Sequence, residues 1–160
     1  MDNKLTASCI HGVLITELRQ IPDERGAVLH MLRNDSSDYT HFGESYFSEI
    51  FPGAVKAWKR HFRQTQIFTV PVGRIRLVIY DDRRNSPTKN ETQVLELGRS
   101  DAYLRVLVPP KLWYGFTCIS YWPALLANLT DIPHEQEESE VRPFNDPSMP
   151  ALKLITNTLL

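Results

Sequence analysis

The sequence has little cysteine and no long apolar run. Its two cysteines, Cys9 and Cys118, are too few for a disulfide scaffold and fit no paired metal-ligand spacing, so we interpret them as free thiols in a reducing cytosol. No stretch approaches the ~18 consecutive apolar residues of a membrane span, and residues 1–9 lack the apolar run of a secretory signal. These absences predict a cytoplasmic protein without a membrane anchor.

An excess of charge of one sign is also missing. Lys and Arg number 18 and Asp and Glu 19, a formal net charge of −1, which argues against a nucleic-acid-binding protein. The chain contains no glycine-rich phosphate loop and no internal repeat. Its length suits one domain with a single core. We expect residues 1–160 to form that domain, with residues 132–160 as its extended C-terminal segment.

Short strand-like stretches, separated by Gly, Pro and Asp, dominate the chain. We expect strands at residues 10–18, 27–32, 46–51, 55–66, 67–72, 74–81, 93–97, 103–108, 111–116 and 124–129. Residues 21–26 have turn chemistry and predict a hairpin between the first two strands. Residues 132–140 are expected to form an exposed loop, and residues 151–160 fit a strand, a helix or a partner contact. The pattern predicts an all-β sandwich or barrel.

The stretch at residues 55–66 is the most informative, because it mixes aromatic, basic and titratable side chains. Strict strand alternation divides it into two faces, one with Lys56, Trp58, Arg60 and Phe62, the other with Ala57, Lys59, His61 and Arg63. Such a strand offers a stacking surface, an anion partner and a group that titrates near neutral pH. The alternative is an edge strand whose basic residues prevent aggregation.

Short motifs along the chain resemble the motifs of one known family and occur in the same order as in that family. They are Gly12-Val13-Leu14, Asp23-Glu24-Arg25-Gly26, His61, Gly73 with Asp81, Ser86-Pro87-Thr88, Val108-Pro109-Pro110, Gly115-Phe116, Thr130-Asp131 and Asn145-Asp146-Pro147. Over residues 10–150 the chain thereby resembles the dTDP-4-dehydrorhamnose 3,5-epimerases. The resemblance implies a cupin-like double-stranded β-helix, or jelly roll, that works as a homodimer on a nucleotide sugar.

The resemblance also implies roles for individual residues. His61 stands where the family has its catalytic base, and Asp146 falls in the motif whose aspartate hydrogen-bonds that histidine. Arg25 matches the arginine that holds the nucleotide phosphates. Further candidates for substrate binding are Glu49, Trp58, Lys59, Arg60, Gln66, Trp113 and Asn128.

Three positions depart from the family pattern. The tyrosine that returns the proton in the family corresponds to Ala127, and a lysine near the site corresponds to Gln66. The family histidine immediately before Gly115 is replaced by Tyr114. Since Pro109-Pro110 stiffens the entry to this strand, we nominate Tyr114 as the replacement acid.

The chemistry that these residues support needs no metal or organic cofactor. A 4-keto group acidifies the neighbouring C–H bonds, so a base, a stabiliser of the enolate oxygen and a proton donor on the opposite face suffice. A neutral histidine suits the first role, and Lys59 or Arg60 the second. His11, His30, His41 and His134 share no ligand spacing with His61, which disfavours a metal-dependent cupin.

Structural readings of the same residues stay open. Trp58 and Trp113 either belong to the core or stack on the ligand. Tyr114 and His61 are either hydrogen-bonded structural residues or catalysts. Asp146 precedes a proline, so it either stabilises a turn or orients the histidine.

We expect an epimerase that inverts C3, C5 or both of a nucleotide-linked 4-keto-6-deoxyhexose in deoxysugar or surface polysaccharide biosynthesis. The alternatives are a 3,4-ketoisomerase of the same fold and a sugar-nucleotide-binding protein without activity. The resemblance favours dTDP as the nucleotide, with CDP and GDP open.

Overall fold

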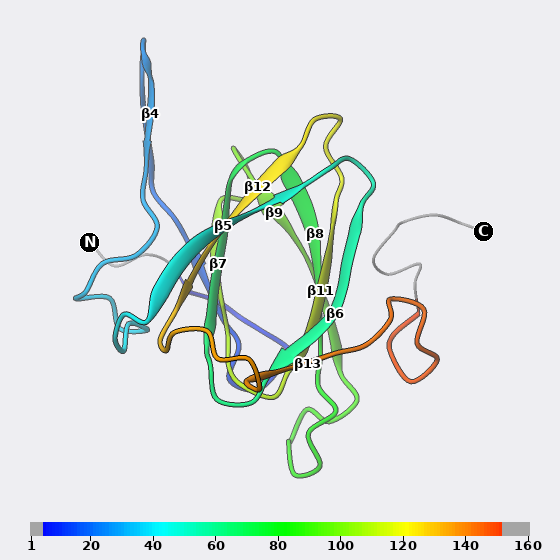
Figure 1. The fold of residues 1–160 in the computed structure, drawn as a ribbon. Coiled ribbons are helices and arrows are strands. Elements are labelled where there is room, and N and C mark those ends of the chain that lie inside the picture. The colour runs from blue at the N-terminus through cyan, green and yellow to red at the C-terminus, as the bar shows by residue number, and fades with distance from the viewer. Residues whose placement is uncertain (1–4, 152–160) are drawn as a thin grey trace.

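The computed structural model describes residues 5–151, which form two antiparallel sheets facing each other and a separate hairpin (Figure 1). No helix occurs in these residues, so nothing in them meets the length and hydropathy of a membrane-spanning helix. Cys9 and Cys118 are both free, as the sequence predicts.

The six-stranded sheet and the five-stranded sheet are each assembled from strands far apart in sequence. The order in the first is β1 (Leu5–Thr6), β2 (Leu14–Glu17), β10 (Leu104–Val108), β7 (Gln66–Val72), β12 (Ala124–Thr130) and β5 (Glu44–Ile50). The order in the second is β13 (Ser139–Val141), β6 (Val55–His61), β11 (Trp113–Cys118), β8 (Arg74–Tyr80) and β9 (Thr92–Gly98). This architecture confirms the predicted all-β jelly roll.

The main core fills the space between the two sheets. Strand alternation explains it well in β8, where Ile75, Leu77 and Ile79 are fully buried and face the six-stranded sheet's apolar residues. Val78, between them, points to the outer side of the five-stranded sheet. There it joins a second cluster with Trp58, Trp113 and Met149, so residues after β13 cover part of the outer side.

The hairpin formed by β3 (Gln20–Asp23) and β4 (Gly26–Leu29) stands away from both sheets (Figure 1). The sequence predicts a hairpin here but assigns its first strand to residues 10–18, which is wrong. Residues 10–18 instead contribute β2, which pairs with β10. Pro22 favours a turn in the sequence. It lies in β3 nevertheless, because both strands of a two-stranded sheet are edge strands, where proline is tolerated.

The predicted loop at residues 132–140 is partly wrong, because Ser139 begins β13, which pairs with β6. The Glu138 carboxylate just before it is buried and accepts hydrogen bonds from the backbone amides of Arg63 and Gln64 and from Nε of Arg63. These charge-assisted hydrogen bonds offset the free-energy cost of burying a carboxylate. The polar sequence of residues 132–140 gives no sign that one of its side chains is buried. Residues 152–160, within the stretch left open above, lie outside the described residues.

A buried ion pair fixes the long loop before β5. Nε of Arg105 on β10 donates to Oδ2 of Asp38 at 3.0 Å, and Nη1 donates to the Met31 carbonyl at 2.7 Å. Both side chains of the pair are only 3% exposed. One guanidinium therefore attaches two points of the loop to the six-stranded sheet.

Asp81 explains the Ser86-Pro87-Thr88 motif in structural terms. Burial alone would raise the pKa of Asp81, but hydrogen bonds from Arg83, Ser86 and Thr88 hold it well below its usual range. The charged carboxylate thus organises the loop between β8 and β9.

Candidate active site

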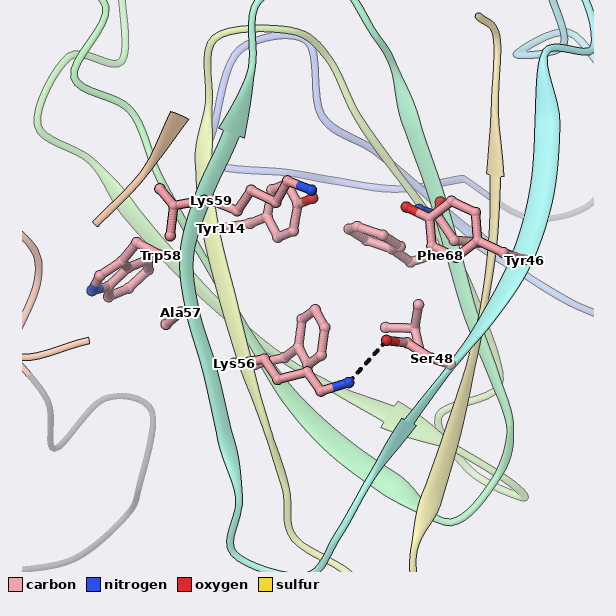
Figure 2. Close-up of a pocket in the computed structure, with 12 residues that line it drawn as sticks. Tyr46, Ser48, Lys56, Ala57, Trp58, Lys59, Phe68 and Tyr114 are labelled. Carbon is pink, nitrogen blue, oxygen red and sulfur yellow. Dashed lines mark hydrogen bonds between the residues drawn. The ribbon is translucent and has the colours of Figure 1, made fainter. Parts of the chain in front are cut away.

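A cavity of about 310 Å³ lies between the two sheets (Figure 2). The five-stranded sheet contributes Lys56, Lys59, Tyr114 and Phe116 to its lining. The opposite wall, from the six-stranded sheet, carries Tyr46, Ser48, Phe68, Leu126 and Asn128. Phe68, Phe116 and Leu126 make part of the lining apolar, and Phe68 packs edge-on against Tyr114. The other lining side chains named above add two ammonium groups and three hydroxyls.

A β-bulge in β6 corrects the predicted division of this strand into two faces. Tyr114 pairs with Lys59, whereas Phe116 pairs with Lys56, so β6 uses one more residue than β11 over this interval. Lys56 and Lys59 consequently both line the cavity, although strict alternation assigns them to opposite faces. The ring of Trp58, between them, points away from the cavity (Figure 2).

The two lysines are held differently. Nζ of Lys56 donates to Oγ of Ser48 at 3.1 Å and to the Glu49 carbonyl at 2.8 Å, which ties the two sheets together (Figure 2). Lys59 makes no ion pair or hydrogen bond with residues 5–151. Burial lowers the pKa of Lys59 from its usual value. Lys59 is thus a cation available to a ligand.

His61 and Tyr114 are neighbours on the five-stranded sheet. Nε2 of His61 lies 3.1 Å from Oη of Tyr114, and His61 is only 2% exposed. Burial, with the nearby charge of Lys59, lowers the pKa of His61 to about 4, so the imidazole is neutral at pH 7. Burial also raises the pKa of Tyr114 well above its ordinary value. Tyr114 lines the cavity and His61 lies behind it.

The predicted hydrogen bond between Asp146 and His61 is absent. Oδ1 of Asp146 accepts from the amide and hydroxyl of Ser148 at 2.8 and 2.6 Å, the local turn typical of aspartate before proline. Within residues 5–151, Nδ1 of His61 has no hydrogen-bond partner. The described chain therefore supplies no carboxylate to orient this imidazole.

Arg60 and Trp113 do not line the cavity, and Trp58 lines it with its ring pointing away (Figure 2). Arg60 pairs with Glu140 at 2.6 Å and Asp82 at 3.2 Å, and its guanidinium lies 4.5 Å from the centre of the Trp113 ring. Both tryptophans are 0% exposed, so neither offers a face to a nucleotide base. They are core aromatics, the structural reading left open above.

Glu49 and Arg25 are also far from their expected positions. Glu49 alternates with Ser48 on β5, so its side chain is exposed and only its carbonyl contributes, through Lys56. Arg25 occupies the turn of the β3–β4 hairpin, where its side chain is 81% exposed and pairs with Asp23. Within one chain, Arg25 does not approach the cavity.

Asn128 and Gln66 are at the site, and Tyr46 is the residue that sequence reasoning missed. Asn128, and not its neighbour Ala127, lines the cavity, with Gln66 buried behind it. Nδ2 of Asn128 donates to Oη of Tyr46 at 2.7 Å. The alternation in residues 46–51 predicts a strand, but no sequence signal shows that β5 pairs with β12 and faces β6.

Residues 5–151 contain no group of three or more His, Cys, Asp and Glu side chains placed to hold a metal ion. What the cavity does offer is proton chemistry, from a neutral imidazole paired with a phenol, an unpaired ammonium and a second phenol.

The sequence profile of the dTDP-4-dehydrorhamnose 3,5-epimerases matches residues 7–153. The chain belongs to this family. The enzyme is therefore a sugar-nucleotide 3,5-epimerase-like isomerase, and the resemblance noted in its motifs is confirmed.

Several relatives agree with this placement. The probable low-salt glycan biosynthesis epimerase Agl13 of Haloferax volcanii is 36% identical over 133 residues, covering 82% of this chain and 85% of Agl13. The spore coat polysaccharide biosynthesis protein SpsL of Bacillus subtilis is 29% identical over 139 residues, covering 86% and 91%. The crystal structure of a dTDP sugar isomerase from Desulfovibrio desulfuricans G20 is 52% identical, with a TM-score of 0.87 and coverage of 89% and 90%.

Proposed function

We propose that this enzyme inverts C3, C5 or both of a dTDP-linked 4-keto-6-deoxyhexose, in deoxysugar or surface polysaccharide biosynthesis. The observation that carries the proposal is the His61–Tyr114 pair at the wall of the cavity, in a chain of this family. The names of Agl13 and SpsL support a role in making a glycan or polysaccharide. The name of the 52% identical isomerase supports dTDP as the nucleotide.

His61 is the proposed final acceptor of the substrate proton. Because Tyr114 lies between His61 and the cavity, the proton passes through its hydroxyl. Oη of Tyr114 takes the hydrogen from the sugar carbon while its own hydrogen moves to Nε2 of His61. The electron pair of the broken C–H bond forms the C=C bond of an enolate, and the carbonyl π electrons move to oxygen. No metal takes part in this step.

Lys59 is the proposed stabiliser of the enolate oxygen. Its ammonium lines the cavity on the same strand as His61 and, within residues 5–151, forms no ion pair, although the charge of Glu44 acts on it. A fixed cation in a partly buried site stabilises developing negative charge more than it does in water. Arg60, the other candidate, is engaged with Glu140 and Asp82.

Tyr114 cannot also be the acid on the opposite face, which revises the role nominated from the sequence. Inversion requires that the proton leave one face of the carbon and return to the other. Tyr114 and His61 belong to neighbouring strands of one sheet and share a hydrogen bond, so they act from one side. The returning proton needs a donor elsewhere.

We further propose a homodimer in which Arg25 binds the nucleotide phosphates of the partner's site. The hairpin that carries Arg25 extends away from its own sheets, so this guanidinium meets a phosphate only on another copy of the chain (Figure 1). The two free cysteines agree with the cytoplasmic location that the sequence predicts.

The test is incubation with dTDP-4-keto-6-deoxyglucose in heavy water, followed by NMR. We expect deuterium at C3, C5 or both, and a product inverted at the exchanged carbon. A product whose carbonyl has moved from C4 to C3 would instead identify a 3,4-ketoisomerase. If no 4-keto sugar nucleotide exchanges hydrogen with solvent, whether it carries dTDP, CDP or GDP, the proposal is wrong.

A further inference from the structure

Tyr46 stands on the wall of the cavity opposite Tyr114 and Lys59 (Figure 2). It belongs to β5 of the six-stranded sheet, whereas Tyr114 and Lys59 belong to β11 and β6 of the other sheet. The register of β5 and β12 sets Tyr46 directly beside Asn128, whose Nδ2 donates to the Tyr46 hydroxyl at 2.7 Å. A second phenol therefore faces a ligand in the cavity from the other side.

The direction of this hydrogen bond is fixed by a chain of amide side chains. The chain begins at the Ile132 carbonyl, which can only accept, and which takes a hydrogen bond from Nε2 of Gln64 at 2.7 Å. Oε1 of Gln64 must then face Gln66, and it accepts from Nε2 of Gln66 at 2.6 Å. Oε1 of Gln66 in turn accepts from Nδ2 of Asn128 at 2.6 Å. Each amide inherits its orientation from the one before it.

Asn128 consequently presents both amide hydrogens, one to Gln66 and one to Tyr46. Turning this amide over would bring its oxygen against Oε1 of Gln66. The fixed orientation has a cost, since Oδ1 of Asn128 is buried without a donor among the described residues. Because the Tyr46 oxygen accepts from Asn128, its own hydrogen is not needed there and is free to point into the cavity.

We propose that Tyr46 donates the proton that completes the inversion, from the wall opposite His61 and Tyr114. This inference rests on the proposed function. The enolate electrons re-form the carbonyl, the sugar carbon takes the hydrogen of Oη, and Tyr46 is left as a phenolate that accepts from Asn128. Tyr46 is 39% exposed, so water returns a proton to it after product leaves. The protonated His61, which is only 2% exposed, returns its proton through the Tyr114 hydroxyl to water in the emptied cavity.

The surroundings of Tyr46 suit an acid. Burial raises the pKa of Tyr46 above its usual value, and the negative charge of Glu44 adds to this, so the phenol is protonated at neutral pH. The hydrogen bond from Asn128 acts in the opposite sense and stabilises the phenolate that proton transfer creates. Asn128 is thus a positioning residue for Tyr46.

The decisive variant is Tyr46→Phe, which keeps the ring and removes the hydroxyl. With dTDP-4-keto-6-deoxyglucose in heavy water, we expect formation of the inverted product to fall about 10²- to 10⁴-fold. Hydrogen exchange without inversion should continue at a rate near that of the wild type, because the His61–Tyr114 pair removes and returns the proton on its own face. Tyr121→Phe, on a side chain that is 97% exposed, is the matched control and should leave both rates unchanged.

Two results with Tyr46→Phe would overturn the inference while leaving the proposed function intact. One is inversion within about twofold of the wild type. The other is an equal loss of exchange and inversion, which would mean that the hydroxyl only helps to bind substrate. A wild-type enzyme that exchanges no hydrogen overturns the proposed function as well, and that failure is seen without any variant.

Asn128→Leu tests the hydrogen bond to Tyr46 without turnover. Leucine has no donor, so the phenolate of Tyr46 loses the hydrogen bond that stabilises it. The pKa of Tyr46 should rise relative to the wild type. It is measured by ultraviolet pH titration, as the difference between each protein and the same protein carrying Tyr46→Phe. We also expect inversion to fall while exchange persists. An unchanged or lower pKa, or undiminished inversion, would contradict the role of Asn128.

Discussion

The imidazole of His61 and the ring of Tyr114 lie almost parallel, at an interplanar angle of 7°, and are joined by a hydrogen bond of 3.1 Å. Neither ring can act on a cavity ligand alone, since Tyr114 reaches the cavity and His61 supplies the basic nitrogen. We therefore regard the pair as one proton-transferring unit, and this makes a quantitative prediction.

His61→Asn and Tyr114→Phe should each lower kcat/KM by about 10²- to 10⁴-fold, the usual size of general acid–base catalysis. The double variant should be little worse than either single one, because residues that act as a unit are strongly non-additive. Steady-state rates of all four proteins, with circular dichroism to check folding, give the comparison. Losses that multiply in the double variant would mean that the two residues work independently.

The low pKa of His61, about 4, predicts how stability depends on pH. The unfolded chain binds this proton near pH 6.5, before the folded protein does. The stabilisation from neutral His61 is thus complete above pH 6.5 and is lost as the pH falls toward 4. Urea unfolding should show the wild type losing stability faster than His61→Asn in this window, by at most about 1.4 kcal/mol per pH unit. Parallel curves for the two proteins would contradict a depressed pKa.

Lys59 and Lys56 should respond differently to the same substitution. Lys59→Met removes the cation proposed to face the enolate oxygen, and we expect kcat to fall at least about 10²-fold with little change in stability. Lys56→Met breaks the bonds to Ser48 and the Glu49 carbonyl, so its main effect should be on thermal stability. Equal kcat losses in the two variants would remove the special role of Lys59.

The proposed exchange of Arg25 between subunits can be tested by mixing two inactive proteins. A dimer of one Arg25→Ala chain and one His61→Asn chain has one site intact if Arg25 serves the partner's site, and none if it serves its own. After denaturation and refolding of an equal mixture, about half of the dimers are mixed, so activity should return to about one quarter of the wild type. No recovery, with dimers shown by light scattering, would contradict the exchange.

Two acidic residues of the loop before β5, Asp38 and Asp35, allow a buried ion pair to be compared with an exposed one. Asp38→Ala leaves the Arg105 guanidinium buried without its carboxylate, so the free energy of unfolding should fall by about 3–5 kcal/mol. Asp35→Ala removes an exposed partner of Arg33 and should change stability little. Urea unfolding of both variants provides the measurement, and similar values for the two would show that the Arg105 pair does not hold the loop.

Much of the fold could be predicted because its strands are short, bounded by Gly and Pro, and apolar on alternate residues. Ile75, Leu77 and Ile79 illustrate this, since their spacing alone places them in the core. The strand at residues 20–23 could not be predicted, because Pro22 signals a turn unless the strand is known to lie at an edge.

The site was harder to predict than the fold. His61, Tyr114, Lys59 and Asn128 were expected at it from strand order and from family resemblance, and they gather around the cavity. Asp146 was misplaced because an aspartate before proline bonds its own turn as readily as a distant histidine. Tyr46 was missed because its position depends on which strands pair, which is a property of the whole sheet.

The bulge in β6 makes the length of that strand a functional constraint. Its pairing with β11 changes phase between Lys56 and Lys59, so both ammonium groups enter the cavity although they are three positions apart. Deleting one residue there would restore regular pleating and turn one lysine to the outer side, into the space now filled by tryptophan. The catalytic pocket should accordingly tolerate changes of side chain in this strand far better than a change in the number of its residues.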